Sequence, residues 1–278
     1  MTMTAGKAPV NELQGTDRPT RAGGWRVVAV QECRDLWVGG RGPLLVFAFS
    51  ILLSAMTYLA ATNRAMNFLE QREAVNLTLQ VALSVGVLLT LLVSADAISG
   101  ERERGTLEAL LLTPVSRRAI IGGKLVAAMT LWLACLVAVL PYLWVLGRGV
   151  AVAGPAAVLA LCVGTLVALG LGSLGLLISA CTNSNKASLA ISLLVLLTMF
   201  APTQIPALPK TGIGELLVRV NPIGSALHYV SQVLVSHRGW IHDLSYLASP
   251  AILAVVTGAV LIVAGPRIIK LNAGVSSS

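Results

Sequence analysis

The sequence is poor in charged and aromatic residues: Asp, Glu, Lys and Arg make up 12% of its 278 residues, and Phe, Trp and Tyr make up 5%. Soluble domains carry about 25% charged residues. This chain is 56% hydrophobic, with a mean hydropathy of +0.82. The composition excludes an ordinary soluble protein and predicts an integral membrane protein.

Cysteine is scarce and irregularly spaced. Cys33, Cys135, Cys162 and Cys181 contain no Cys-x-x-Cys pair, and two of them lie inside apolar runs. We interpret all four as small core residues and not as disulfides or metal ligands.

Motifs for nucleotide, metal or covalent chemistry are lacking. Gly122-Gly123-Lys124 fails as the end of a Walker A loop, because Arg118 stands at the first glycine position and Leu125 follows the lysine. The three histidines show no metal-ligand spacing such as His-Glu-x-x-His. The sequence therefore predicts no enzyme, and no cofactor or metal in this chain.

Long apolar segments, in contrast, are abundant. A helix of about 20 residues crosses the hydrocarbon core of a bilayer, which is about 30 Å thick. In the fourth segment, Gly164, Ala168 and Gly172 are spaced four apart and predict close packing against another helix. We expect an all-α integral membrane protein with six transmembrane helices, at about 43–62, 75–98, 118–146, 155–181, 186–201 and 246–265.

Two segments outside these spans have patterns of their own. Residues 1–22 are polar, lack the apolar core of a signal peptide and predict a disordered cytoplasmic tail. Residues 202–245 contain four prolines and predict short re-entrant or interfacial helices at the outer mouth, including one at 223–235. Residues 23–278 would form a single six-helix transmembrane domain.

Residues 25–37 carry apolar side chains at helical spacing, while Arg26, Glu32, Arg34 and Asp35 fall on other faces. This pattern predicts an amphipathic helix in the membrane interface, with tryptophans at headgroup level. The alternative is a helix packed on the protein itself.

The positions of Lys and Arg predict the orientation. With the N-terminus inside, 14 of the 20 Lys and Arg residues fall in inner segments and 6 in outer ones. Positive residues accumulate on the cytoplasmic side of membrane proteins. Both termini and residues 99–117 are therefore predicted to be cytoplasmic, in a plasma membrane, and the net charge of +8 needs no nucleic-acid partner.

The densest run of charge lies between the second and third spans, at residues 99–124. A break is expected at Ser99-Gly100. The sequence Glu101-Arg102-Glu103-Arg104 alternates in sign, so that much of its charge can be neutralised locally. Ser116 is predicted to cap the third span.

A short amphipathic helix is expected between these charges and Ser116. Thr106 would cap it and Pro114 would end it. Leu107, Leu110 and Leu111 would share one face. A turn that tucks leucines into lipid is one interpretation, whereas a helix that docks in a groove of a soluble partner explains both the leucines and the charge.

The run Ser-Gly-Glu-Arg-Glu-Arg-Gly-Thr-Leu-Glu-Ala-Leu-Leu-Leu-Thr-Pro-Val-Ser-Arg-Arg, followed by Gly123-Lys124, resembles the signature loop of ABC-type-2 transporter permeases. The closest likeness is to sodium-efflux, drug-efflux and copper-enzyme-maturation permeases. In that family the loop is the coupling helix, which seats in a cleft of a separate ATPase subunit. Carried over by position, the coupling residues would be Glu101, Arg102, Glu103, Arg104, Gly105, Thr106, Leu107, Glu108, Leu110, Leu111, Pro114 and Arg117.

The resemblance implies the membrane subunit of an ATP-driven exporter. Two permease copies, expected to be a homodimer, would work with two ATPase copies that bind ATP and Mg. The alternative is a permease that transports nothing and relays ATPase motion to an extracytoplasmic partner protein, with residues 202–245 as the docking surface.

Overall fold

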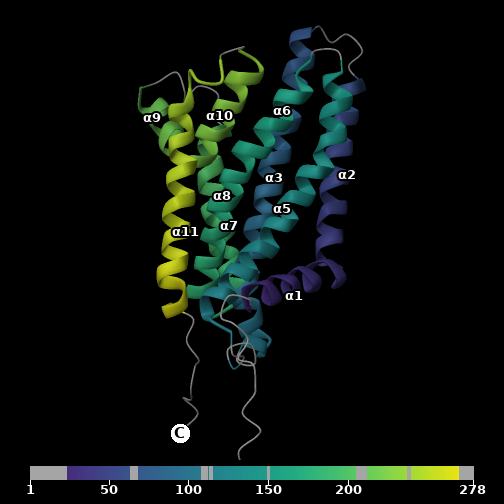
Figure 1. Ribbon diagram of the computed structural model, residues 1–278. Coiled ribbons are helices and arrows are strands. Elements are labelled where there is room, and N and C mark those ends of the chain that lie inside the picture. The colour runs from purple at the N-terminus through teal and green to yellow at the C-terminus, as the bar shows by residue number, and fades with distance from the viewer. Residues whose placement is uncertain are drawn as a thin grey trace, which may run out of the picture.

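The computed structural model is a bundle of upright helices, with α1 lying across its lower end and α9 and α10 at its upper end (Figure 1). It describes residues 24–62, 68–107, 112, 115–148, 151–204, 212–236 and 239–268, and none of these residues lies in a strand. The elements are α1 (Gly24–Val38), α2 (Arg41–Thr62), α3 (Phe68–Glu103), α5 (Arg117–Gly147), α6 (Ala153–Leu159), the π-helical turn η1 (Ala160–Gly164), α7 (Thr165–Cys181), α8 (Asn185–Phe200), the 3₁₀ turn η2 (Ala201–Gln204), α9 (Gly212–Val220), α10 (Pro222–Leu234), the 3₁₀ turn η4 (Leu244–Leu247) and α11 (Ala248–Ile268).

Six stretches of the described chain are long and apolar enough to cross a membrane, which confirms the predicted fold class. The shortest has 19 residues. At 1.5 Å per residue it measures about 28 Å, close to the thickness of the hydrocarbon core. The stretches are Arg41–Leu59, Gln71–Glu103, Arg117–Gly147, Ala153–Cys181, Asn185–Gln204 and Leu244–Ile268.

The second span continues as one helix through Ser99-Gly100, so the expected break there was wrong. Ser99 is fully buried, and its hydroxyl donates to the Ala95 carbonyl at 2.8 Å, inside the same helix. A Cβ at position 100 would collide with the side chains of Asp96 and Arg104. Glycine here leaves room for the side chains of Asp96 and Arg104 and does not end the helix.

The helix α1 packs against α5 and buries Val28 and Ala29. The contact is close at Gly123 of α5, where a Cβ would lie 2.7 Å from Val28 Cγ1. Trp37 Nε1 donates to Thr130 Oγ1 at 3.1 Å. Glu32 also faces α5, which corrects the expectation that its charge lies off the packed face.

Trp132 of α5 fills the centre of the bundle and is 2% exposed. Its Nε1 donates to Thr165 Oγ1 at 3.0 Å, where the fourth span passes from the π-helical turn into α7. A Cβ at Gly164 would lie 2.5 Å from both Trp132 and Leu83. The indole therefore occupies space that only glycine leaves open.

Small residues further along α7 keep it close to α3. Ala168 is fully buried. A Cβ at Gly172 would lie 3.5 Å from Thr90, and one at Gly175 would lie 2.8 Å from the Leu91 carbonyl oxygen. Without a hydrophobic driving force between helices in lipid, such close van der Waals contact is a main source of their association.

The segment before the last span contains η2, α9, α10 and η4. The helix expected at 223–235 is α10, and Asn221 caps it by accepting from the backbone N of Ile223 at 3.0 Å. One face of α10 enters the core, where Tyr229 and Leu234 are almost fully buried. The Tyr229 hydroxyl donates to the Trp240 carbonyl at 2.8 Å.

The cysteines are all free thiols, but only Cys135 is a buried core residue. Cys33 is half-buried, and Cys162 and Cys181 are exposed, which corrects the interpretation of all four as core. A thiol behaves as a small hydrophobe, so an outward-facing cysteine is compatible with a lipid-facing helix surface.

We predict that Gly164→Ala destabilises the protein by about 1–3 kcal/mol, because the added methyl group overpacks the contact with Trp132. Thermal unfolding in detergent measures the effect. Gly258→Ala is the matched control, since a Cβ at Gly258 of α11 meets no atom within 4 Å. Equal melting temperatures of the two variants would contradict the packing assignment.

Candidate functional site

The charges at the end of α3 bind different neighbouring elements instead of one another. Glu101 binds α5, Arg102 and Glu103 bind the segment between α7 and α8, and Arg104 binds back to Asp96. The expected local neutralisation was therefore wrong. These residues connect the lower ends of several helices.

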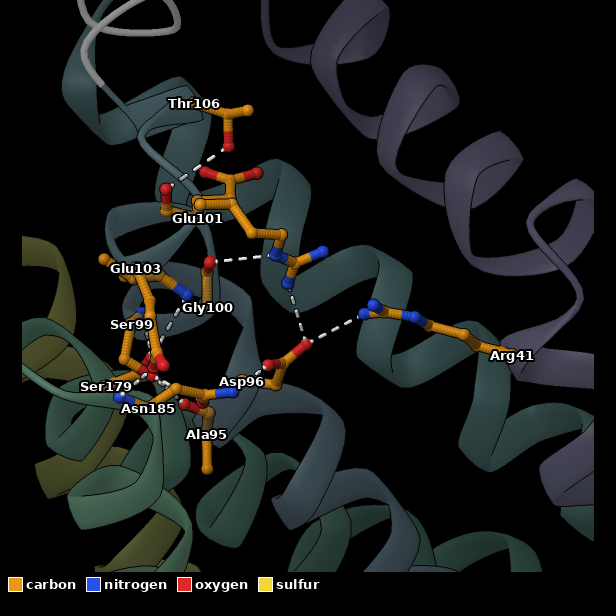
Figure 2. A network of polar contacts seen from close by, with 12 residues as sticks. Arg41, Ala95, Asp96, Ser99, Gly100, Glu101, Glu103, Thr106, Ser179 and Asn185 are labelled. Atoms are coloured by element: carbon orange, nitrogen blue, oxygen red, sulfur yellow. Dashed lines mark hydrogen bonds and ion pairs between the residues drawn. The ribbon is translucent and has the colours of Figure 1, made fainter.

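Asp96 is the centre of one part of this network. Its Oδ2 accepts from Arg41 Nη1 of α2 at 3.0 Å and from Arg104 Nη2 at 3.3 Å. Its Oδ1 accepts from Asn185 Nδ2 of α8 at 2.7 Å. Figure 2 shows the Asp96 carboxylate between these side chains. One carboxylate thus holds the start of α2, the start of α8 and the turn after α3.

Arg102 and Glu103 bind the end of α3 to the end of α7 and the start of α8. The Arg102 guanidinium donates to the carbonyl oxygens of Thr182 and Ala180, near the end of α7. Glu103 Oε2 accepts from the backbone N of Asn185 at 3.1 Å. A carboxylate at the first residue of a helix satisfies a free N–H group and complements the helix dipole.

A buried polar contact lies just above these charges. Ser179 Oγ of α7 accepts from the backbone N of Ser99 at 2.8 Å, and Ser99 Oγ lies 3.0 Å from Asn185 Oδ1. Three helices, α3, α7 and α8, are therefore joined by short side chains where the membrane-spanning part of α3 ends.

Lys124 of α5 forms the second part of the network. Its side chain is 1% exposed, and Nζ lies 2.8 Å from Glu32 Oε1 and 2.6 Å from Glu101 Oε1. Burial raises the pKa of Glu32 above its usual range, while the neighbouring ammonium of Lys124 opposes that shift. An unpaired buried ammonium would cost several kcal/mol, so the two carboxylates are needed for Lys124 to lie here.

Sequence reasoning missed the pairing of Lys124 and Glu32. In the sequence, Lys124 stands where the lysine of a Walker A loop would stand, and Glu32 falls off the apolar face of residues 25–37. The sequence does contain a signal for this pairing. A lysine early in an apolar helix needs an acidic partner, and the glycine beside it allows another helix to approach closely. Gly123 and Lys124 supply these two contacts to α1.

A groove of about 910 Å³ lies beside this network, between α1, the start of α2, α3 and α5. Its lining is mixed in charge and includes Asp35, Arg41, Asp96, Arg104 and Lys124. The groove and the network together make this end of the bundle the most highly charged region that the structure describes.

Two expected coupling residues make turn contacts within the chain. Gly105 has a φ of +72°, a left-handed conformation that favours glycine, so it reverses the chain after α3. The Thr106 hydroxyl donates to the Glu101 carbonyl at 3.3 Å. At the other end of the segment, Ser116 caps α5 as predicted by accepting from Ala119 N at 3.2 Å, and Arg117 Nη1 donates to the Pro266 carbonyl at 3.3 Å.

The leucines of this segment differ in environment. Leu107, two residues after the Gly105 turn, is 5% exposed and packs with Ile98, Leu176 and Leu261 inside the chain. Leu112 is 78% exposed. Glu108, Leu110, Leu111 and Pro114 lie outside the described residues.

The described residues contain no group of three or more His, Cys, Asp or Glu side chains that could hold a metal ion. His228 lies against Tyr246, with ring centroids 4.7 Å apart, and its Nε2 is 3.3 Å from Gln232 Nε2. The charged network consists of ion pairs and helix contacts, and such an arrangement fixes helices relative to one another.

Six apolar spans define a multi-pass membrane protein. The family model for ABC-2 family transporter proteins matches residues 43–265, and the chain belongs to this family. No curated protein matches the chain. Proteins of this family are the membrane subunits of ABC transporters; they are not themselves catalytic and generally work with an ABC ATPase subunit.

We predict that Asp96→Ala destabilises the protein by about 1–3 kcal/mol, because Arg41, Arg104 and Asn185 lose a shared acceptor. Hydrogen–deuterium exchange should also rise at the backbone of Arg104, which donates to Gly100. Asp35→Ala, on α1, is the control. Unchanged exchange at Arg104 in Asp96→Ala would show that the carboxylate does not hold this turn.

Proposed function

We propose that the chain is the permease subunit of an ABC exporter, and that a separate ATPase subunit docks on the segment joining α3 to α5. The observation that carries this proposal is that the start of that segment, at the end of α3, is bound to four other helices. Asp96, Glu101, Glu103 and Lys124 form its contacts with α1, α2, α5 and α8. A displacement applied there would reach most of the bundle.

In this proposal the driving energy comes from the partner, which supplies the ATP and Mg sites. ATP binding closes a pair of ATPase subunits, the coupling segments of two permease copies move with them, and the permease homodimer changes the side on which it is open. The excess of Lys and Arg in the inner segments supports cytoplasmic termini in a plasma membrane.

The predicted coupling residues divide into two groups under this proposal. Docking would fall to Leu112, whose side chain is exposed, together with the sequence-based candidates Glu108, Leu110, Leu111 and Pro114. The other group transmits the movement inward: Glu101, Arg102, Glu103, Arg104, Gly105, Thr106, Leu107 and Arg117.

The relay alternative draws support from the other end of the bundle. Apolar side chains are exposed there on and beyond α9, including Leu216 (62%), Val220 (68%) and Ile241 (83%). They could meet lipid or an extracytoplasmic protein. ATP-dependent flux in proteoliposomes supports export, whereas a stable complex with an outer partner and no flux supports the relay.

We predict that Leu112→Asp weakens binding of the ATPase encoded beside this chain by about tenfold, because a charge replaces an exposed apolar contact. Co-purification with the tagged permease measures binding, and ATP turnover should fall with it. Leu216→Asp, which also replaces an exposed leucine but at the other end of the bundle, is the matched control. Equal ATPase binding by the two variants would contradict docking at this segment.

A further inference from the structure

The coupling segment leaves the bundle from α3 and returns through α5, and one ion pair closes its base. Glu101 lies at the end of α3 and Lys124 lies two turns into α5, 23 residues further along the chain, yet their charged atoms are 2.6 Å apart. The other oxygen of Glu101, Oε2, is buried and accepts no hydrogen bond from the described residues. Lys124 is thus the main polar partner of the Glu101 carboxylate.

The same ammonium holds α1. Glu32 lies 92 residues from Lys124 in sequence, and its Oε1 is 2.8 Å from Nζ. Around this contact the two helices approach so closely that a Cβ at Gly123 would meet Val28 and the backbone of Ala29. With its side chain 1% exposed, Lys124 cannot exchange these carboxylates for water without moving a helix.

We propose that Lys124 is a positioning residue that makes α1 move together with the coupling segment. It ties Glu101, at the base of the segment, to Glu32 of α1. The inference deepens the proposed function and rests on it. In this role α1 is not only a helix on the membrane surface; it carries the displacement from the segment to α2, which it joins through the turn at Gly40.

Native Cys33 provides a direct test that needs neither substrate nor ATPase. It follows Glu32 on α1 and is half-buried. In the full chain with Cys135, Cys162 and Cys181 replaced by Ser, we expect Lys124→Met to raise the rate of maleimide labelling of Cys33 about tenfold, because a broken buried ion pair releases α1. Arg26→Gln, an exposed charge on the same helix, should leave the rate unchanged.

The second measurement uses the complex with the ATPase. Lys124→Met should still co-purify with the ATPase subunit, while permease-dependent ATP turnover falls at least about fivefold. The conservative variant Lys124→Arg keeps a cation between Glu32 and Glu101 and should retain both readouts. If Lys124→Met does not fold, Glu32→Gln tests the α1 contact alone and should also raise Cys33 labelling.

Each remaining outcome is decisive. Unchanged Cys33 labelling in both Lys124→Met and Glu32→Gln overturns the tie to α1. Faster labelling with unchanged ATP turnover overturns the role in coupling. If the wild-type chain fails to bind the ATPase at all, the proposed function fails, whereas the labelling result still decides whether Lys124 holds α1.

Discussion

The burial of the Lys124 ammonium is the constraint on which the lower end of the bundle depends. A cation with 1% of its side chain exposed is stable only with carboxylates at contact distance, and here these come from two other helices. The ion pairs therefore fix the positions of α1, α3 and α5 relative to one another. Gly123 permits the arrangement by letting α1 approach the α5 backbone.

The rest of the bundle is held differently. In the spans, contacts are made by small residues and by the Trp132 indole against Gly164, with few charges involved. Close packing of this kind makes helices move as rigid bodies, because any relative shift creates a clash. A charged, interlinked base below a tightly packed bundle is the arrangement expected when force enters at one end and is needed at the other.

The charged residues of the coupling segment also illustrate why a motif does not specify its contacts. A shared signature can be preserved because it binds a partner or because it holds the segment in place. In this chain Glu101, Arg102 and Glu103 make contacts within the permease, and Leu107 is part of its core. Further along the segment, the side chain of Leu112 is exposed.

The sequence by itself determined the class of protein, the six spans and local features such as the Ser116 cap. These depend on apolar length or on neighbours three or four residues away, which a sequence displays directly. Only the tertiary structure decided that Glu32 faces inward, that Leu107 is buried and that α3 continues past Gly100. The partners of Glu32 and Leu107 lie on other helices, 92 positions away in the case of Glu32, and the space around Gly100 is filled by side chains in a way that a linear pattern cannot show.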